Sequence, residues 1–101
     1  MDQLCFYVSE NHHHDGKPLY EWLLEQARAL GIHGGSAFRA IAGYGRHGRM
    51  HEESFFELAG ELPVKVEFVA EAVLVDRLLA MLQPHGLNIF YLRSKVLSGI
   101  V

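Results

Sequence analysis

The sequence has one cysteine and no long apolar run, and each shortage excludes a class of protein. With Cys5 alone, the chain cannot form an internal disulfide, so we expect a reducing compartment. The first residues lack the basic region and apolar core of a signal peptide, and no apolar run approaches the roughly 18 residues that span a bilayer. We therefore expect a cytoplasmic protein without a transmembrane segment.

Positive charge is also scarce. Nine lysines and arginines stand against twelve acidic residues, and a formal net charge of −3 argues against a general nucleic-acid binder. Hydrophobic residues make up 50% of the 101 positions, which is enough for a single folded domain over residues 1–101. A chain of this length has only a modest core, so we expect part of the apolar surface to be buried between subunits.

Glycine, by contrast, is concentrated in one segment. Residues 31–49 hold six of the ten glycines, together with three arginines and two histidines. Glycine lets a backbone approach a ligand closely, and arginine offers fixed charge and paired donors to phosphate or carboxylate. We expect Gly31 to Gly35 to end a helix and begin a strand. Residues 43–49 are then a candidate anion-binding loop, and the alternative is a mobile surface connection.

Hydrophobic periodicity predicts the order β-α-β-β-α-β. This order is typical of an α+β ferredoxin-like fold, an antiparallel four-stranded sheet with two helices on one face. The apolar side chains of Tyr7, Val69, Phe90 and Leu92 are expected on the other face, which self-association would cover. The expected elements are a strand at 4–8, a polar loop at 10–17, a helix from Pro18 to Gly31, a strand at 36–42, a long loop at 43–62 with a short helix at 52–59, a strand from Pro63, a helix at 72–82 and a strand at 87–92.

Several motifs carry a resemblance to a known family. Gly43-Tyr44-Gly45-Arg46, with the glycines from Gly31 onward, resembles the segment that opens the T-loop of PII signal-transduction proteins. The spacing is closer still to the PII-like family called domain of unknown function 190. Further matching pieces are Pro18-Leu19-Tyr20-Glu21, His51 and Leu62-Pro63-Val64, so the resemblance extends over nearly the whole chain.

The resemblance implies a non-catalytic regulatory homotrimer whose sheets line its centre. Small effectors, adenine nucleotides in PII proteins, would bind in clefts between subunits, and the 43–62 loop would engage a partner protein. His47 replaces the glutamine of PII proteins, and the connection at 83–86 is too short for their phosphate-binding B-loop. AMP or ADP is therefore easier to accommodate than ATP. The candidate effector-binding residues are Arg39, Gly43, Tyr44, Gly45, Arg46, His47, Arg49, Arg93 and Lys95.

Two alternatives stay open. Arg39 lies on a predicted strand and needs a partner, which is either an inter-subunit salt bridge or a ligand in the cleft. The seven histidines favour a second hypothesis, a metal-binding or ion-tolerance trimer similar to the CutA family, with His12, His13, His14, His47 and His51 as candidate ligands.

No residue pattern indicates an enzyme. No serine or cysteine has a histidine partner that the sequence identifies, and Cys5 is expected to be a small core residue. Trp22 belongs to the apolar stripe of the first helix and is also expected in the core. Asp76 is expected on a solvated helix face.

Overall fold

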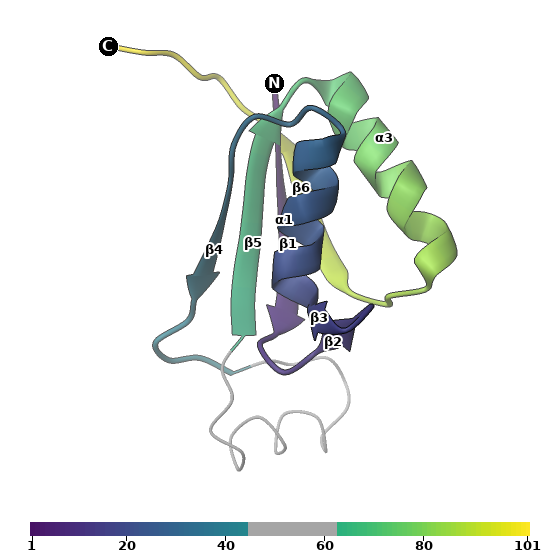
Figure 1. Cartoon of the computed structure of the whole chain (residues 1–101). Helices are drawn as coiled ribbons and strands as arrows, with labels where there is room; N and C mark the ends of the chain where they lie inside the picture. The colour runs from purple at the N-terminus through teal and green to yellow at the C-terminus, as the bar shows by residue number, and fades with distance from the viewer. Residues whose placement is uncertain (45–62) are drawn as a thin grey trace.

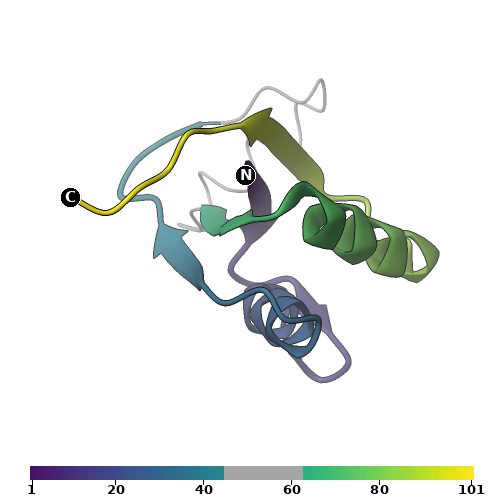
Figure 2. The ribbon, with the colours of Figure 1, turned by 90° about the horizontal axis from the view of Figure 1, so that it is seen from above.

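The computed structural model describes residues 1–44 and 63–101 and shows a four-stranded antiparallel sheet with both helices on one face (Figures 1 and 2). The sheet order is β4-β5-β1-β6, which confirms the predicted ferredoxin-like fold. The elements are β1 (Asp2–Ser9), β2 (His13–His14), β3 (Lys17–Pro18), α1 (Leu19–Ala29), β4 (Gly35–Arg39), β5 (Pro63–Ala70), α3 (Ala72–Leu82), the 3-10 helix η1 (Gln83–His85) and β6 (Phe90–Lys95). The helix expected at 52–59 lies outside the described residues. None of the described helices is long and apolar enough to cross a membrane.

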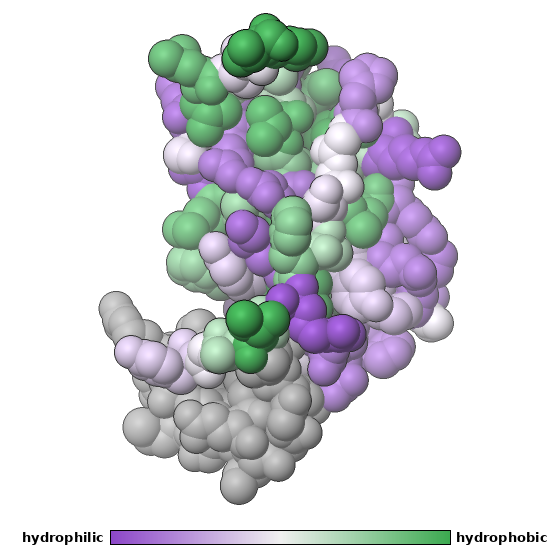
Figure 3. All heavy atoms as spheres, turned by 90° about the vertical axis from the view of Figure 1, so that its left-hand side faces the viewer, coloured by the Kyte–Doolittle hydropathy of each residue, from purple (hydrophilic) through white to green (hydrophobic). Residues whose placement is uncertain are grey.

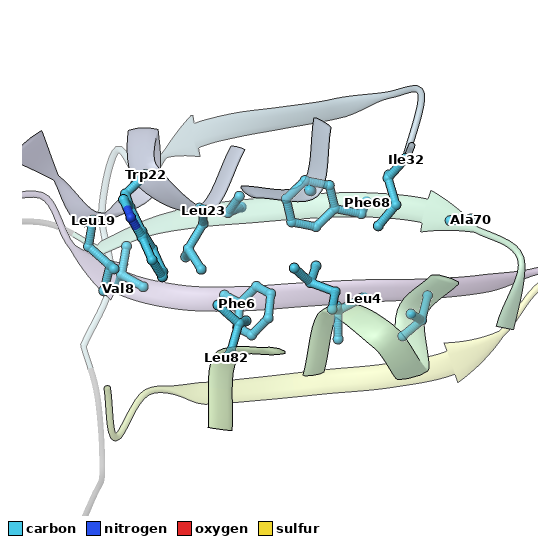
Figure 4. Close-up of a cluster of buried hydrophobic side chains, with 14 of the residues drawn as sticks. Leu4, Phe6, Val8, Leu19, Trp22, Leu23, Ile32, Phe68, Ala70 and Leu82 are labelled. Atoms are coloured by element: carbon cyan, nitrogen blue, oxygen red, sulfur yellow. The ribbon is translucent and has the colours of Figure 1, made fainter. Parts of the chain in front are cut away.

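The core lies between the sheet and the two helices (Figure 4). Alternation in β1 turns Leu4, Phe6 and Val8 toward the helices, and β5 does the same with Val66 and Phe68. The helices close the layer with side chains at helical spacing. Those fully or nearly buried are Leu19, Trp22, Leu23, Val75, Leu78 and Leu82.

The first glycine cluster has the structural role expected of it. Gly31 has φ +98° directly after α1, a left-handed conformation that an L side chain rarely adopts. Gly35 begins β4 against the ring of Phe68, where an added Cβ would stand 2.6 Å from Phe68 Cε1. Gly31 and Gly35 therefore have structural roles, at the end of α1 and at the start of β4.

A small hairpin replaces the polar loop expected at 10–17. Strands β2 and β3 pair His13 with Pro18 and His14 with Lys17. Asp15 and Gly16 form the turn between them, with φ of +52° and +80°. Two consecutive left-handed residues are what a tight hairpin turn requires, and Asp-Gly is a preferred pair for it.

Two strand boundaries also differ from the predicted ones. The second strand, expected at 36–42, ends at Arg39, where its pairing with β5 reaches Val64. The last strand begins at Phe90 and not at Leu87, and it continues to Lys95. The reason is backbone conformation: Gly86 and Asn88 have φ of +60° and +57°, so the chain cannot be extended through them.

The sheet face turned away from the helices is apolar in large part. Tyr7, Phe38, Val69, Phe90 and Leu92 lie on it and are 38% to 55% exposed. Viewed from the β4 side, hydrophobic and hydrophilic side chains alternate over this part of the molecule (Figure 3). The structure thus confirms the expected apolar positions and adds Phe38 to them.

Candidate functional site

The predicted effector loop is anchored at the end of the sheet where β1 and β4 finish and β5 begins. In the register of the sheet, Val64 of β5 lies between Val8 of β1 and Arg39 of β4. Beyond the ladder, the amide of Ala40 donates a hydrogen bond of 2.9 Å to the carbonyl of Pro63. The two chain segments that lead into and out of residues 45–62 are therefore fixed to each other at their base.

Arg39 is held at this base by Glu10. Its Nε donates to Glu10 Oε1 at 2.7 Å, and the Arg39 side chain is 64% exposed whereas that of Glu10 is 24% exposed. Within one chain, the partner of Arg39 is thus a carboxylate that directly follows β1. An ion pair this exposed contributes little to stability, about 0–1 kcal/mol, but it orients the guanidinium at the root of the loop.

Five of the predicted effector and metal residues, Gly45, Arg46, His47, Arg49 and His51, lie outside the described residues. Of the neighbouring predicted positions, Gly43 and Tyr44 are described, and Tyr44 is 85% exposed. Ile41, three residues earlier, is 96% exposed. The chain therefore leaves β4 with an apolar and an aromatic side chain both in solvent, close to Arg39 in the sequence.

Arg93 forms a cross-link that the sequence analysis did not predict. Its Nε donates to Asp2 Oδ2 at 2.8 Å, its Nη1 to Asp76 Oδ1 at 2.8 Å and its Nη2 to the carbonyl of Ala72 at 3.2 Å. These bonds connect β6 to β1 and to the first turns of α3. The hydrogen bond from Arg93 lowers the pKa of the Asp2 carboxyl, and the bonds to Asp76 and Asp2 raise the pKa of Arg93. Asp76 is 64% exposed on α3, as expected of a solvated helix face, and its ion pair with Arg93 is an additional contact that the sequence did not indicate.

Lys95 lies beside this cross-link. Its Nζ is 3.8 Å from Asp2 Oδ1, and its side chain is 88% exposed. Asp2 itself is buried, and among the described residues its Oδ1 has no hydrogen-bond partner. Lys95 therefore offers an exposed positive charge above a buried carboxylate.

One chain does not bring the two parts of the predicted effector set together. Lys95 pairs with Asp2 at the start of β1, whereas Arg39 aligns with Val8 near its end. At about 3.3 Å per residue, these positions are about 20 Å apart along the strand. A site that uses both Arg39 and Lys95 would need two copies of the chain.

The three consecutive histidines do not converge. His13 is exposed, and its Nδ1 lies 2.9 Å from the carbonyl oxygen of Asn11. His14 turns toward α1, packs edge-on against Trp22 and lies 3.2 Å from a ring nitrogen of His85. Within residues 1–44 and 63–101, no group of three histidine, cysteine or acidic side chains is arranged to hold a metal ion. No sequence pattern pairs His85 with His14, because 71 positions separate the two residues.

Trp22 is a core residue, as expected. Cys5 is buried as well, but the alternation of β1 places it beside Leu92 on the sheet face turned away from the helices and outside the core layer. Burial raises the pKa of the Cys5 thiol, and the nearby Glu67 adds to this effect. A thiol that is buried and hard to ionise is a poor nucleophile.

Comparison with known proteins agrees with this architecture. The family model of domain of unknown function 190, described as an uncharacterized ACR, matches residues 1–95. A UPF0166 protein of Aquifex aeolicus (strain VF5) is 41% identical over 76 residues, which cover 75% of this chain and 72% of that protein. The crystal structure of a proposed PII-like signaling protein from Thermus thermophilus covers 92% of this chain and 81% of its own, with a TM-score of 0.54 and 15% identity.

At 15% identity, the structural likeness shows the fold alone. The sheet order, the two helices on one face and the long segment between β4 and β5 define a PII-like fold. Because the family model matches nearly the whole chain, the protein belongs to the family of domain of unknown function 190.

Proposed function

We propose that this protein is a non-catalytic regulator of the PII kind that binds a small anionic effector between subunits and signals through residues 43–62. The main support for the proposal is the structure at the base of that segment, where an exposed arginine lies on a fixed backbone. Two stems joined by the Ala40–Pro63 hydrogen bond present the exposed Arg39, and Arg46 and Arg49 follow in the sequence. Three arginines at and beyond one fixed base suit a phosphate-bearing ligand.

The proposal requires self-association, because the effector set is divided between two ends of the sheet. The uncovered apolar face offers a surface for it. Residues 96–101 offer a second surface for self-association. The Val96 amide donates a hydrogen bond to the Met1 carbonyl, and beyond it the chain extends away from the sheet (Figures 1 and 2). Leu97, Ile100 and Val101 in this segment are fully exposed. We propose the homotrimer that the family resemblance implies, and a shared effector site requires that the Arg93 and Lys95 end of one chain lie near the loop base of another.

The connection before β6 bears on which nucleotide binds. It runs from Gln83 to Ile89 and is longer than the four residues that the sequence analysis assigned to it, so length alone does not exclude a triphosphate. Its composition still differs from a glycine- and lysine-rich phosphate loop, since residues 83–89 contain one glycine and no lysine or arginine. AMP or ADP is therefore the preferred effector, and ATP is the comparison.

Isothermal titration calorimetry of the full chain with AMP, ADP and ATP tests the proposal. We expect heat with AMP or ADP, and a loss of affinity of about 10- to 100-fold in Arg46→Ala and Arg49→Ala, the size of one charge-assisted hydrogen bond. Arg77→Ala, an exposed arginine on α3, is the matched control and is expected to bind as the wild type does. No heat with any of the three nucleotides would contradict the proposal.

A homotrimer is tested separately, by light scattering coupled to size-exclusion chromatography. We expect three chains per particle, and replacement of Leu92 by aspartate on the uncovered sheet face is expected to reduce that number. The substitution Val73→Asp, at an exposed apolar position on α3, is the control and is expected to leave the assembly unchanged. A wild-type monomer at micromolar concentration would refute the assembly.

A further inference from the structure

Three aromatic side chains from distant parts of the sequence form a cluster at one edge of the helical layer. His14 comes from β2, Trp22 from α1 and His85 from η1. The ring centroids lie 4.4 Å apart for His14 and Trp22, 4.9 Å for Trp22 and His85, and 5.1 Å for His14 and His85, all edge-on. Trp22 is 4% exposed and closes the inner side, whereas His85 is exposed.

The two imidazoles meet through their nitrogens. His14 Nε2 lies 3.2 Å from His85 Nδ1. A neutral imidazole has one N–H and one lone pair, so in the absence of a metal a single proton joins the two nitrogens. If each ring instead carries its proton on the other nitrogen, two lone pairs face each other across this gap.

The same separation suits a tetrahedral metal ion. Two Zn–N bonds of about 2.0–2.1 Å at a tetrahedral angle place the nitrogens about 3.3–3.4 Å apart, close to the 3.2 Å observed here. Asp15 Oδ2 lies 4.0 Å from His14 Nε2, and its carboxylate is 68% exposed. It adds negative charge beside the pair, and His85 on the other side is exposed to solvent.

We infer that His14 and His85 form a two-histidine site for a divalent transition-metal ion, with Zn²⁺ the best fit. The metal takes the place of the shared proton, which moves to the other nitrogen of its own ring, and connects the β2–β3 hairpin to the turn that follows α3. His13 takes no part, since its Nδ1 lies against the carbonyl oxygen of Asn11, whereas His14 faces His85. The inference does not depend on the proposed function, because the pair contains none of the predicted effector residues.

Zinc titration of the full chain tests the inference directly. The protein has a single tryptophan, so its emission reports on Trp22 beside the two imidazoles. We expect one zinc ion per chain by calorimetry, a change in Trp22 emission with the same midpoint, and reversal of both by EDTA. Long-range ¹H–¹⁵N spectra of the imidazoles should show His14 and His85 shifting while His13 does not.

Three variants distinguish this site from adventitious binding by the histidine triplet. His14→Gln and His85→Gln keep a polar side chain at each position and are expected to lower zinc affinity at least about tenfold. His13→Gln is the matched control on the same hairpin and is expected to bind zinc as the wild type does. Unchanged zinc affinity in His85→Gln, or its loss in His13→Gln, would overturn the inference.

Fold and assembly are checked in the same variants. His85 is exposed, so circular dichroism of His85→Gln without zinc should match that of the wild type. Zinc is expected to raise the Tm of the wild type and to leave that of His85→Gln unchanged, because a ligand that binds only the folded state stabilises it. A zinc-dependent increase in particle size that persists in His85→Gln would show binding between molecules and would refute the intramolecular site.

Discussion

Replacing Gly35 with alanine should destabilise the fold through a steric clash at a single ring. An ideal Cβ at Gly35 lies 2.6 Å from Phe68 Cε1, 2.8 Å from Phe68 Cδ1 and 3.0 Å from Leu24 Cδ2. Ordinary carbon–carbon contact begins at about 3.5 Å, so the ring of Phe68 must move by close to an ångström. Phe68 is 2% exposed and packs edge-on against Phe6, with 6.4 Å between the ring centroids, so its ring has little room to move.

The expected cost follows from overpacking. Forcing an extra methyl group into a packed core destabilises proteins by about 1–3 kcal/mol. Loss of glycine also restricts the unfolded chain, which by itself stabilises a compatible site by about 0.4–1 kcal/mol. Gly34→Ala shows that second effect alone, because no atom lies within 4 Å of a Cβ built there. Gly35→Ala should therefore be about 1–3 kcal/mol less stable than Gly34→Ala.

Urea denaturation followed by Trp22 emission measures both variants at one protein concentration. Equal concentration matters because the stability of a self-associating protein depends on it. A double variant, Gly35→Ala with Phe68→Leu, should be more stable than the sum of the single changes implies, because the smaller side chain removes the clash. If Gly35→Ala and Gly34→Ala have the same stability within about 0.3 kcal/mol, a common error of such comparisons, the steric argument is wrong.

Three further predictions concern buried groups. Arg93 lowers the pKa of Asp2 in the folded state from 3.8. The stability that Asp2 contributes is therefore present above pH 3.8 and is lost as the pH falls below it. The Tm difference between wild type and Asp2→Asn should shrink over that fall in pH. The thiol of Cys5 should react with a disulfide reagent at least about tenfold faster in denaturant than in the native protein, since burial raises its pKa. Leu78→Ala should lower the free energy of unfolding by about 2–5 kcal/mol, because Leu78 is fully buried. Val73→Ala, at a 55% exposed position on the same helix, should lower it by less than about 0.5 kcal/mol. Chemical denaturation measures both variants.

The fold was predictable because its signals are local. Each signal depends on residues close in sequence: the strand alternation around Leu4 and Phe6, the helical spacing around Trp22, the helix end at Gly31 and the strand start at Pro63. The errors lie where backbone conformation, and not side-chain pattern, decides the structure. Asn88 is an example: its positive φ delays β6, although Leu87 and Ile89 continue an apolar pattern.

The candidate sites were less predictable, because they depend on contacts between distant residues. The ion pairs of Arg93 with Asp2 and Asp76 join three elements, and no spacing in the sequence indicates them. His85 likewise meets His14 only because η1 folds back beside the hairpin. Arg39 was expected on a strand, with a partner either in another subunit or in a ligand. Within one chain its partner is Glu10, which directly follows β1.

The position of the charges makes assembly a requirement of the proposed function. Arg39 and the loop base lie at one end of β1, and Lys95 with Arg93 lies at the other. Arg93 already donates to two carboxylates and a backbone carbonyl, so Lys95 is the more available of the two cations for a ligand. If an effector contacts both Arg39 and Lys95, these residues belong to different chains. Mixing Arg39→Ala and Lys95→Ala chains after unfolding and reassembly should then restore binding at the interfaces where both native residues meet, whereas each variant alone should bind weakly at every interface. Equal binding in the mixed and unmixed samples would show that the two residues do not share a site.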